Sequence, residues 1–140
     1  MCLKSECLLY FESAMTEYRK EYPDKEDIIN SISAIFSDFV SEDYEGITEN
    51  RIYRLFLNTL KEILNTAFEN NCSKSFLRSF FKRLNNKNVN AYLSSLAKSK
   101  SSDIKFLLER LYTEFVYWAD SDTTRESKLN KLIDLIDSWY

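Results

Sequence analysis

The chain has one glycine, one proline and no histidine among its 140 residues. With so little glycine and proline, it has almost no residues suited to tight hairpin turns or to loops that cradle phosphate groups. The lack of histidine removes Ser-His and Cys-His nucleophile pairs, Glu-x-x-His di-iron sites and the usual zinc ligands. Chemistry by lysine, aspartate, tyrosine or cysteine stays open in principle, but no spacing of these residues indicates it. We therefore expect an all-α protein that is not an enzyme and uses no cofactor.

Cysteines and long apolar runs are also scarce. Cys2, Cys7 and Cys72 are odd in number and lack Cys-x-x-Cys spacing, so we expect reduced thiols rather than a disulfide framework or a zinc site. No run of about 18 apolar residues is present to cross a membrane. The N-terminal segment carries acidic residues where a signal peptide would have an uninterrupted apolar region. These features predict a cytoplasmic protein that is not exported and does not contact a membrane.

The residues that are abundant point to one large core. Hydrophobic residues make up 44% of the chain and aromatic residues 15%, with ten phenylalanines and nine tyrosines against two methionines. A chain of this length fits a single domain that buries about two-thirds of the surface of its unfolded form. We predict a single helical domain over residues 1–140, with a core of bulky aromatic side chains.

The apolar residues repeat at three- and four-residue spacing in nearly every segment, which is typical of amphipathic helices. Pro23 ends the first predicted helix, and Asp24 can cap the second. Thr123 and Glu126 have the spacing of a capping box at the start of the last helix. The fold class is thus all-α, a single compact bundle of six or seven helices, which cover residues 3–22, 24–40, 48–70, 73–84, 89–98, 104–119 and 123–139.

Residues 48–70 form the most convincing of these helices. Its apolar residues cover well over half of the circumference, which is broader than a surface helix normally shows. We therefore expect this helix to be central and the most buried. The inward residues are predicted to be Ile52, Leu55, Phe56, Leu60, Ile63, Leu64 and Ala67, with Tyr53, Leu57 and Phe68 widening the face.

Charge is distributed unevenly along the chain. Residues 1–50 carry 4 basic residues against 12 acidic ones, residues 51–105 carry 11 against 3, and residues 106–140 carry 4 against 7. The middle of the chain is therefore basic and both ends are acidic. A polarisation of this size bears on partners and association rate rather than on the fold.

Basic and amide side chains follow the outer faces of the third and fourth predicted helices. On the third helix they fall within about 80° of one another at 100° per residue, opposite the apolar face. If the two helices form a hairpin through residues 70–73, both rows would merge into one patch along a phosphate backbone. The predicted nucleic-acid-binding residues are Arg51, Arg54, Asn58, Lys61, Lys74, Arg78, Lys82, Arg83 and Lys87.

Another interpretation of these rows stays open. Basic residues can simply solvate one face of the protein and pair with the acidic first two helices. The nucleic-acid interpretation is strengthened because Asp103 is the only acidic residue between Glu69 and Glu109. Charge on such a patch would supply affinity without a choice of sequence.

Acidic residues gather between the first two predicted helices and again at residues 42–49. Neither cluster has the alternating acidic positions and central glycine of an EF-hand loop, so we predict no metal site. A partner with a basic surface is the better functional interpretation of these clusters.

The sixth predicted helix carries a second row, Phe106, Arg110, Thr113 and Tyr117, on the side away from its apolar face. A helix that is apolar on two sides is either sandwiched inside the domain or exposes one side to a partner. We expect sandwiching, because the last helix needs a surface to pack against. If the row is exposed, Phe106, Arg110 and Tyr117 would bind a protein partner.

The sequence thus predicts a non-catalytic protein that contacts a nucleic-acid backbone through a basic face, as a small subunit of a nucleoprotein complex. The alternative is an inhibitor or immunity-type protein that binds and neutralises a protein partner through the acidic helices or the row on the sixth helix. A third possibility is a protein that holds a partner helix in a groove, which the wide apolar face of residues 48–70 would allow. No small-molecule substrate is expected.

Overall fold

The computed structural model describes residues 2–118 and 124–140. Over these residues the chain forms seven α-helices and two short 3-10 helices, η1 and η2, with no β-strand. The elements are α1 (Leu3–Glu21), η1 (Pro23–Lys25), α2 (Glu26–Ser41), α3 (Glu49–Glu69), α4 (Lys74–Leu84), α5 (Lys87–Leu96), η2 (Lys98–Lys100), α6 (Ser101–Val116) and α7 (Arg125–Ser138). The prediction of an all-α fold is confirmed for this part of the chain.

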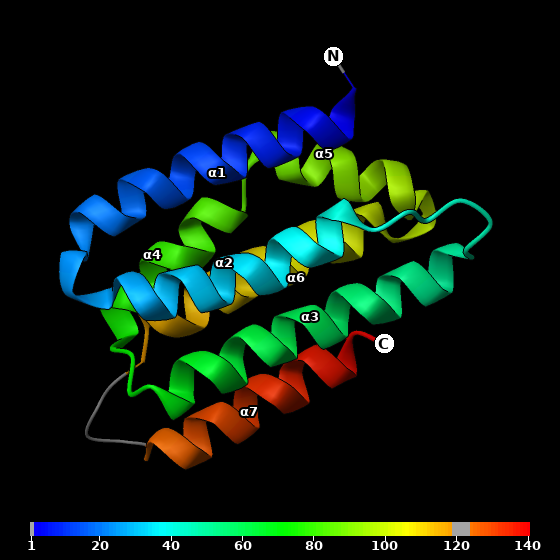
Figure 1. Cartoon of the computed structure of the whole chain (residues 1–140). Helices are drawn as coiled ribbons and strands as arrows, with labels where there is room; N and C mark the ends of the chain where they lie inside the picture. The colour runs from blue at the N-terminus through cyan, green and yellow to red at the C-terminus, as the bar shows by residue number, and fades with distance from the viewer. Residues whose placement is uncertain (1, 119–123) are drawn as a thin grey trace.

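The helices pack in two layers, which Figure 1 shows from the front. In the front layer α1 packs on α2, α2 on α3, and α3 on α7. Behind them α4 and α5 both pack on α6, and contacts of α1 with α5 and α4 join the two layers. The bundle therefore separates α3 from α4, although the two helices are consecutive in the chain.

The position of α3 between α2 and α7 explains its broad apolar face, because the helix buries side chains toward both neighbours. Phe56, Leu60, Ile63 and Leu64 are almost completely buried, as predicted. Leu55 is an exception: the apolar pattern places it inward, but 39% of the residue is exposed. It lies at the edge of the α2–α3 contact rather than within it.

Aromatic rings fill the core between the layers. The rings of Phe11 and Phe36 lie 4.7 Å apart, and Phe81 stacks on Phe115 at 5.5 Å with an angle of 13° between their planes. Phe80 meets Phe81 edge to face at 5.4 Å. Such pairs stabilise a core by about 0.5–1.5 kcal/mol beyond the burial of their area. The prediction of a bulky aromatic core is confirmed.

The helix ends follow the local sequence in most places. The Ser73 hydroxyl accepts a hydrogen bond of 3.2 Å from the Phe76 backbone N–H and caps α4. Asp24 does not cap α2, because it lies inside η1, and α2 begins at Glu26 without a side-chain cap. The extra turn starts at Pro23, whose fixed φ suits the first position of a helix.

The start of the last helix is shifted from its predicted position. Thr123 and Ala119, which were predicted to cap α7 and to extend α6, lie outside the described residues. In the structure Thr124 is the N-cap, and its hydroxyl accepts a hydrogen bond of 3.1 Å from the Ser127 backbone N–H.

The α3–α4 junction is a tight reversal. Asn71 has a positive φ of 55°, the left-handed conformation that asparagine tolerates better than most residues. The Cys72 N–H bonds to the Ala67 carbonyl at 3.1 Å and the Asn71 N–H to the Phe68 carbonyl at 3.2 Å. This pair of bonds is a Schellman motif, which ends α3 and sends the chain to the rear layer.

Two further expectations can be compared with the structure. No helix in the described residues is long and apolar enough to span a bilayer. All three cysteines are free thiols, with Cys2 exposed and Cys7 and Cys72 buried.

Candidate nucleic-acid interface

The basic residues of α4 lie on a helix whose opposite side is anchored in the core. Phe76, Phe80 and Leu84 are buried, which orients the helix about its axis. Arg78 and Lys82, four residues apart, consequently project from the same side and are exposed. Neither makes an ion pair or a side-chain hydrogen bond with any residue that the structure describes. Their charges are therefore available to a ligand.

The start of α5 adds a third exposed cation, Lys87, which likewise has no such partner among the described residues. Lys87 and Lys105 of α6 line the same shallow hollow, together with Asn85 and Asn90. From α4 through η2 the chain contains no acidic residue. We call Arg78, Lys82 and Lys87 the α4–α5 basic surface.

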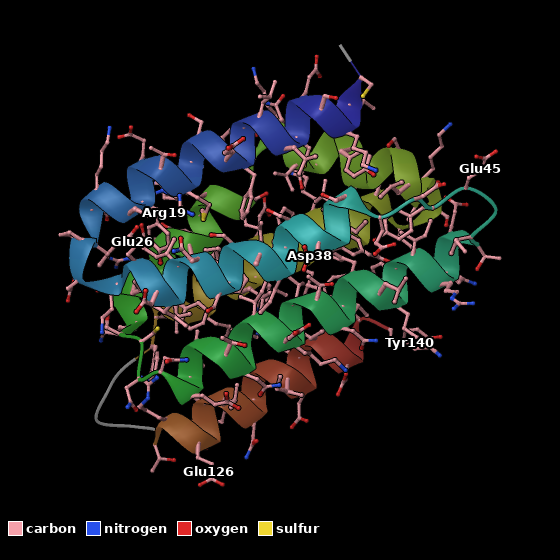
Figure 2. The ribbon with its side chains drawn as sticks, viewed as in Figure 1. Arg19, Glu26, Asp38, Glu45, Glu126 and Tyr140 are labelled. Carbon is pink, nitrogen blue, oxygen red and sulfur yellow. The ribbon has the colours of Figure 1, made fainter. Side chains whose placement is uncertain are left out.

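Two basic side chains of α3 bind residues at the C-terminal end of the chain. The Lys61 ammonium lies 2.8 Å from the Asp137 carboxylate of α7. The Arg54 guanidinium lies over the ring of Tyr140, 4.5 Å from its centroid, and donates a hydrogen bond to its hydroxyl. Tyr140, labelled in Figure 2, follows the end of α7 beside α3. The last helix and the residue that closes the chain thus engage two of the predicted phosphate-binding side chains.

Arg51 and Asn58 also lie on α3, but they line a groove between α2 and α3. The same groove is lined by the carboxylates of Asp38, Glu42, Asp43 and Glu62. A phosphate bound by Arg51 would face these four negative charges, so the surroundings oppose a phosphate contact at this position.

The remaining two predicted residues are held by internal contacts. Arg83 forms an ion pair of 2.6 Å with Glu21 of α1 and lies over the ring of Tyr18, 4.8 Å from its centroid. The Lys74 ammonium donates a hydrogen bond of 2.9 Å to the Trp118 carbonyl after the end of α6. Pairing with the acidic first helix was the alternative interpretation of the basic rows, and Arg83 follows it.

The nine predicted residues therefore do not form one patch. The condition for merging the rows was a hairpin of α3 and α4, and instead α3 packs with α2 and α7 while α4 packs with α6 and α1. Helices α4 and α5 follow each other directly in the chain, and the α3 row packs with neither of them. Asp137 and Glu21, which pair with two of the nine predicted residues, lie far from those residues in the sequence. Helical spacing alone therefore could not predict these ion pairs.

The second row of α6 is not sandwiched, and that expectation is wrong. Phe106 is 58% exposed and Tyr117 is 80% exposed. The physical reason is that α7 packs along α3, so it does not cover this side of α6. Arg110 forms an ion pair of 3.0 Å with Glu114 of its own helix.

Glu114 links α6 to α7. Its carboxylate lies 3.0 Å from the ammonium of Lys128, whose side chain is buried. Partial burial by itself raises the pKa of Glu114, but hydrogen bonds from Lys128 and Arg110 outweigh it, so the pKa lies below the ordinary value. This arrangement is a structural tie between two helices.

No cluster of His, Cys, Asp and Glu that could hold a metal occurs among the described residues. The exposed thiol of Cys2 has a lowered pKa because of its hydrogen bond with the Ser5 hydroxyl. Burial raises the pKa of the Cys7 thiol to about 11 and also raises that of Cys72. The buried thiols are thus held in their neutral form at ordinary pH.

Comparison with protein-family models, with curated proteins and with solved structures finds no match for this chain.

Proposed function

We propose that the protein is a non-catalytic nucleic-acid-binding protein that contacts a phosphate backbone through the α4–α5 basic surface, as a small subunit of a nucleoprotein complex. The observation that supports this most is the exposure of Arg78, Lys82 and Lys87 without an ionic partner among the described residues, in a stretch of chain that lacks acidic residues. Neighbouring cations of this kind bind phosphates without reading bases.

The overall charge suits a contact of limited extent. The chain has a net charge of −3, and most of its acidic residues lie in the first 50 residues. A duplex wrapped around the whole protein would meet these carboxylates, whereas α4 and α5 themselves carry no acidic residue. Exposed Phe106 on the adjoining α6 and Tyr117 directly after it also offer rings on which the bases of a single strand can stack.

The test is a binding titration with charge-reversed variants. Fluorescein-labelled single-stranded and duplex oligonucleotides of about 20 nucleotides, longer than one small binding site, serve as probes in fluorescence anisotropy. The double variant Arg78→Glu, Lys82→Glu should bind at least about tenfold more weakly, because reversal places repulsion at the centre of the surface.

A matched control variant reverses two lysines outside this surface and so changes the net charge of the protein by the same amount. Lys20 on α1 and Lys131 on α7 are exposed and lie outside the α4–α5 basic surface, so Lys20→Glu with Lys131→Glu should reduce binding far less. If the wild type binds neither probe at low salt, or if the two double variants bind equally, the proposal fails.

The alternative, an inhibitor of a protein partner, is favoured by one observation. Large aromatic side chains as exposed as Phe106 and Tyr117 are common in protein interfaces. A photo-crosslinking amino acid at position 117 should then form an adduct with a protein in cells, and one at Leu9, which is also exposed, should not. Absence of any adduct specific to position 117 would reject this alternative.

A further inference from the structure

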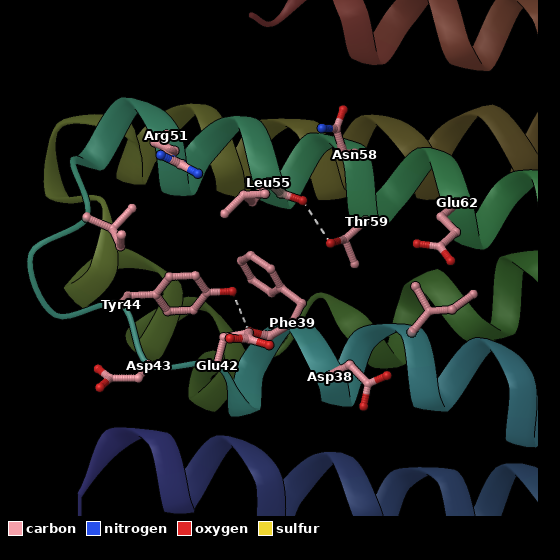
Figure 3. A pocket seen from close by; sticks show the side chains of 12 residues that line it. Asp38, Phe39, Glu42, Asp43, Tyr44, Arg51, Leu55, Asn58, Thr59 and Glu62 are labelled. Atoms are coloured by element: carbon pink, nitrogen blue, oxygen red, sulfur yellow. Dashed lines mark hydrogen bonds between the residues drawn. The ribbon is translucent and has the colours of Figure 1, made fainter.

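A groove runs between α2 and α3 on the front of the molecule, closed at one end by the loop of residues 42–48. Figure 3 shows Leu55, Thr59 and Glu62 on the side of α3 that faces α2, with Arg51 and Asn58 on the same helix but farther from α2. The hollow has a volume of about 420 Å³, within the range of about 300–1,000 Å³ found for ligand sites. It lies outside the α4–α5 basic surface.

The floor of this groove is apolar. Leu55 is 39% exposed and Ile47 is 36% exposed, and Phe39 and Tyr44 pack beside them with ring centroids 5.5 Å apart. The hydroxyl of Tyr44 donates to the Phe39 carbonyl, and that of Thr59 donates to the Leu55 carbonyl at 2.8 Å. Because both hydroxyls are engaged inside the protein, the floor presents mainly carbon to an occupant.

The rim of the groove is acidic. Four carboxylates line it against the single cation Arg51, and none of the four forms an ion pair with any residue of the described part of the chain. Figure 2 shows Asp38 on α2, with Glu45 in the loop beyond it. The rim residues are Asp38, Glu42, Asp43 and Glu62. Unpaired charge around an apolar floor selects an occupant of opposite charge.

We propose that this groove binds an amphipathic helix of a protein partner, with apolar side chains on the floor and lysine or arginine side chains against the rim. A helix fits better than an extended peptide for a physical reason. The walls are helices whose backbone groups are already hydrogen-bonded, so they offer no strand edge, and an occupant must satisfy its own backbone. Because the rim is negatively charged, the sides of the bound helix that face it must be basic.

The probe is a fluorescein-labelled peptide of about 18 residues with leucines at three- and four-residue spacing and lysines on both flanks, long enough to form a helix on binding. A scrambled peptide of the same composition keeps the charge and removes the apolar face. In fluorescence anisotropy the wild-type protein should bind the amphipathic peptide at least about tenfold more tightly than the scrambled one.

One pair of variants tests the floor. Leu55→Asn should weaken binding of the peptide about tenfold or more at both low and high salt, because it removes the exposed apolar side chain at the centre of the floor. Leu9, also exposed but on α1, supplies the control, and Leu9→Asn should leave the affinity unchanged. Melting curves by circular dichroism confirm that both variants are folded.

A second pair tests the rim. Asp38→Lys with Glu62→Lys should weaken binding at low salt about tenfold, and this difference should shrink at high salt, as screening of exposed charges requires. Glu12→Lys with Asp134→Lys changes the net charge equally on α1 and α7 and should have little effect. Neither rim substitution touches the α4–α5 basic surface, so oligonucleotide binding should not be lost in these variants.

Three results would overturn the proposal. The first is a wild type that does not bind the amphipathic peptide in preference to the scrambled one, and the second is that both groove variants bind as tightly as their controls. In the third, the wild type dimerises, Leu55→Asn converts it to a monomer, and the peptide does not compete, which would assign the groove to a second copy of the chain.

Discussion

Phe56 offers the most direct test of how α3 is packed. Its ring is 1% exposed and lies 5.9 Å from the ring of Phe39 on α2. Phe56→Ala removes the ring from the main contact between the two helices and leaves a cavity, since the surrounding core can collapse only in part. Truncations of this kind cost about 3–5 kcal/mol, which includes the lost aromatic pair.

This loss can be converted into a melting temperature. For a chain of 140 residues, the entropy of unfolding is about 0.3 kcal/mol/K near the midpoint. A loss of about 4 kcal/mol then lowers the melting temperature by about 13 °C. Urea unfolding followed by circular dichroism gives the free energy of unfolding directly, and an unchanged m-value shows that the unfolded state is unaltered.

The matched control is the preceding residue. Leu55→Ala should cost less than about 1 kcal/mol, because this side chain is already partly exposed on the floor of the groove. A loss of less than about 1 kcal/mol for Phe56→Ala, or equal losses for the two variants, would mean that the orientation assigned to α3 is wrong.

Two further predictions concern the thiols and the α6–α7 tie. An alkylating reagent should modify the exposed Cys2 rapidly and the other two cysteines only on unfolding, and rapid reaction of all three would contradict their burial. Dithiothreitol should leave the melting temperature unchanged, because the thiols are free, and a lower melting temperature after reduction would contradict this. Because the pKa of Glu114 is lowered in the folded protein, its ionisation stabilises the fold above the ordinary pKa of a carboxyl group, and this contribution is lost as pH falls through the lowered value. Glu114→Gln leaves buried Lys128 without its carboxylate and should therefore lower the free energy of unfolding by about 1–3 kcal/mol at neutral pH and by progressively less in acid. A loss that does not depend on pH would refute the ionised pair of Glu114 and Lys128.

Helical spacing and helix-end residues were sufficient to predict where most of the helices lie. Pro23 and Ser73 act locally, so their effects on the chain can be inferred without the fold. The predicted cap at Asp24 was wrong because Asp24 lies inside the 3-10 helix η1, so α2 begins two residues later than the sequence indicated.

The candidate site was harder to predict, because side chains choose partners from distant parts of the chain. Lys61 lies on the same helical face as Arg51, but only the arrival of α7 places Asp137 beside it. Whether Tyr117 is covered likewise depends on which helix α7 packs against. The apolar pattern of α7 shows that this helix must pack against another helix, but it does not indicate which one.

The central claim, a phosphate contact by the α4–α5 basic surface, is tested most directly by the salt dependence of oligonucleotide binding. For the wild type, log affinity should fall linearly with log salt, with a slope of about 0.9 per phosphate contact on duplex DNA or about 0.7 on a single strand. Replacing Lys82 by alanine should reduce the slope by about one contact and leave sequence preference unchanged. A slope that is the same in wild type and Lys82→Ala, or binding that does not respond to salt, would contradict the account.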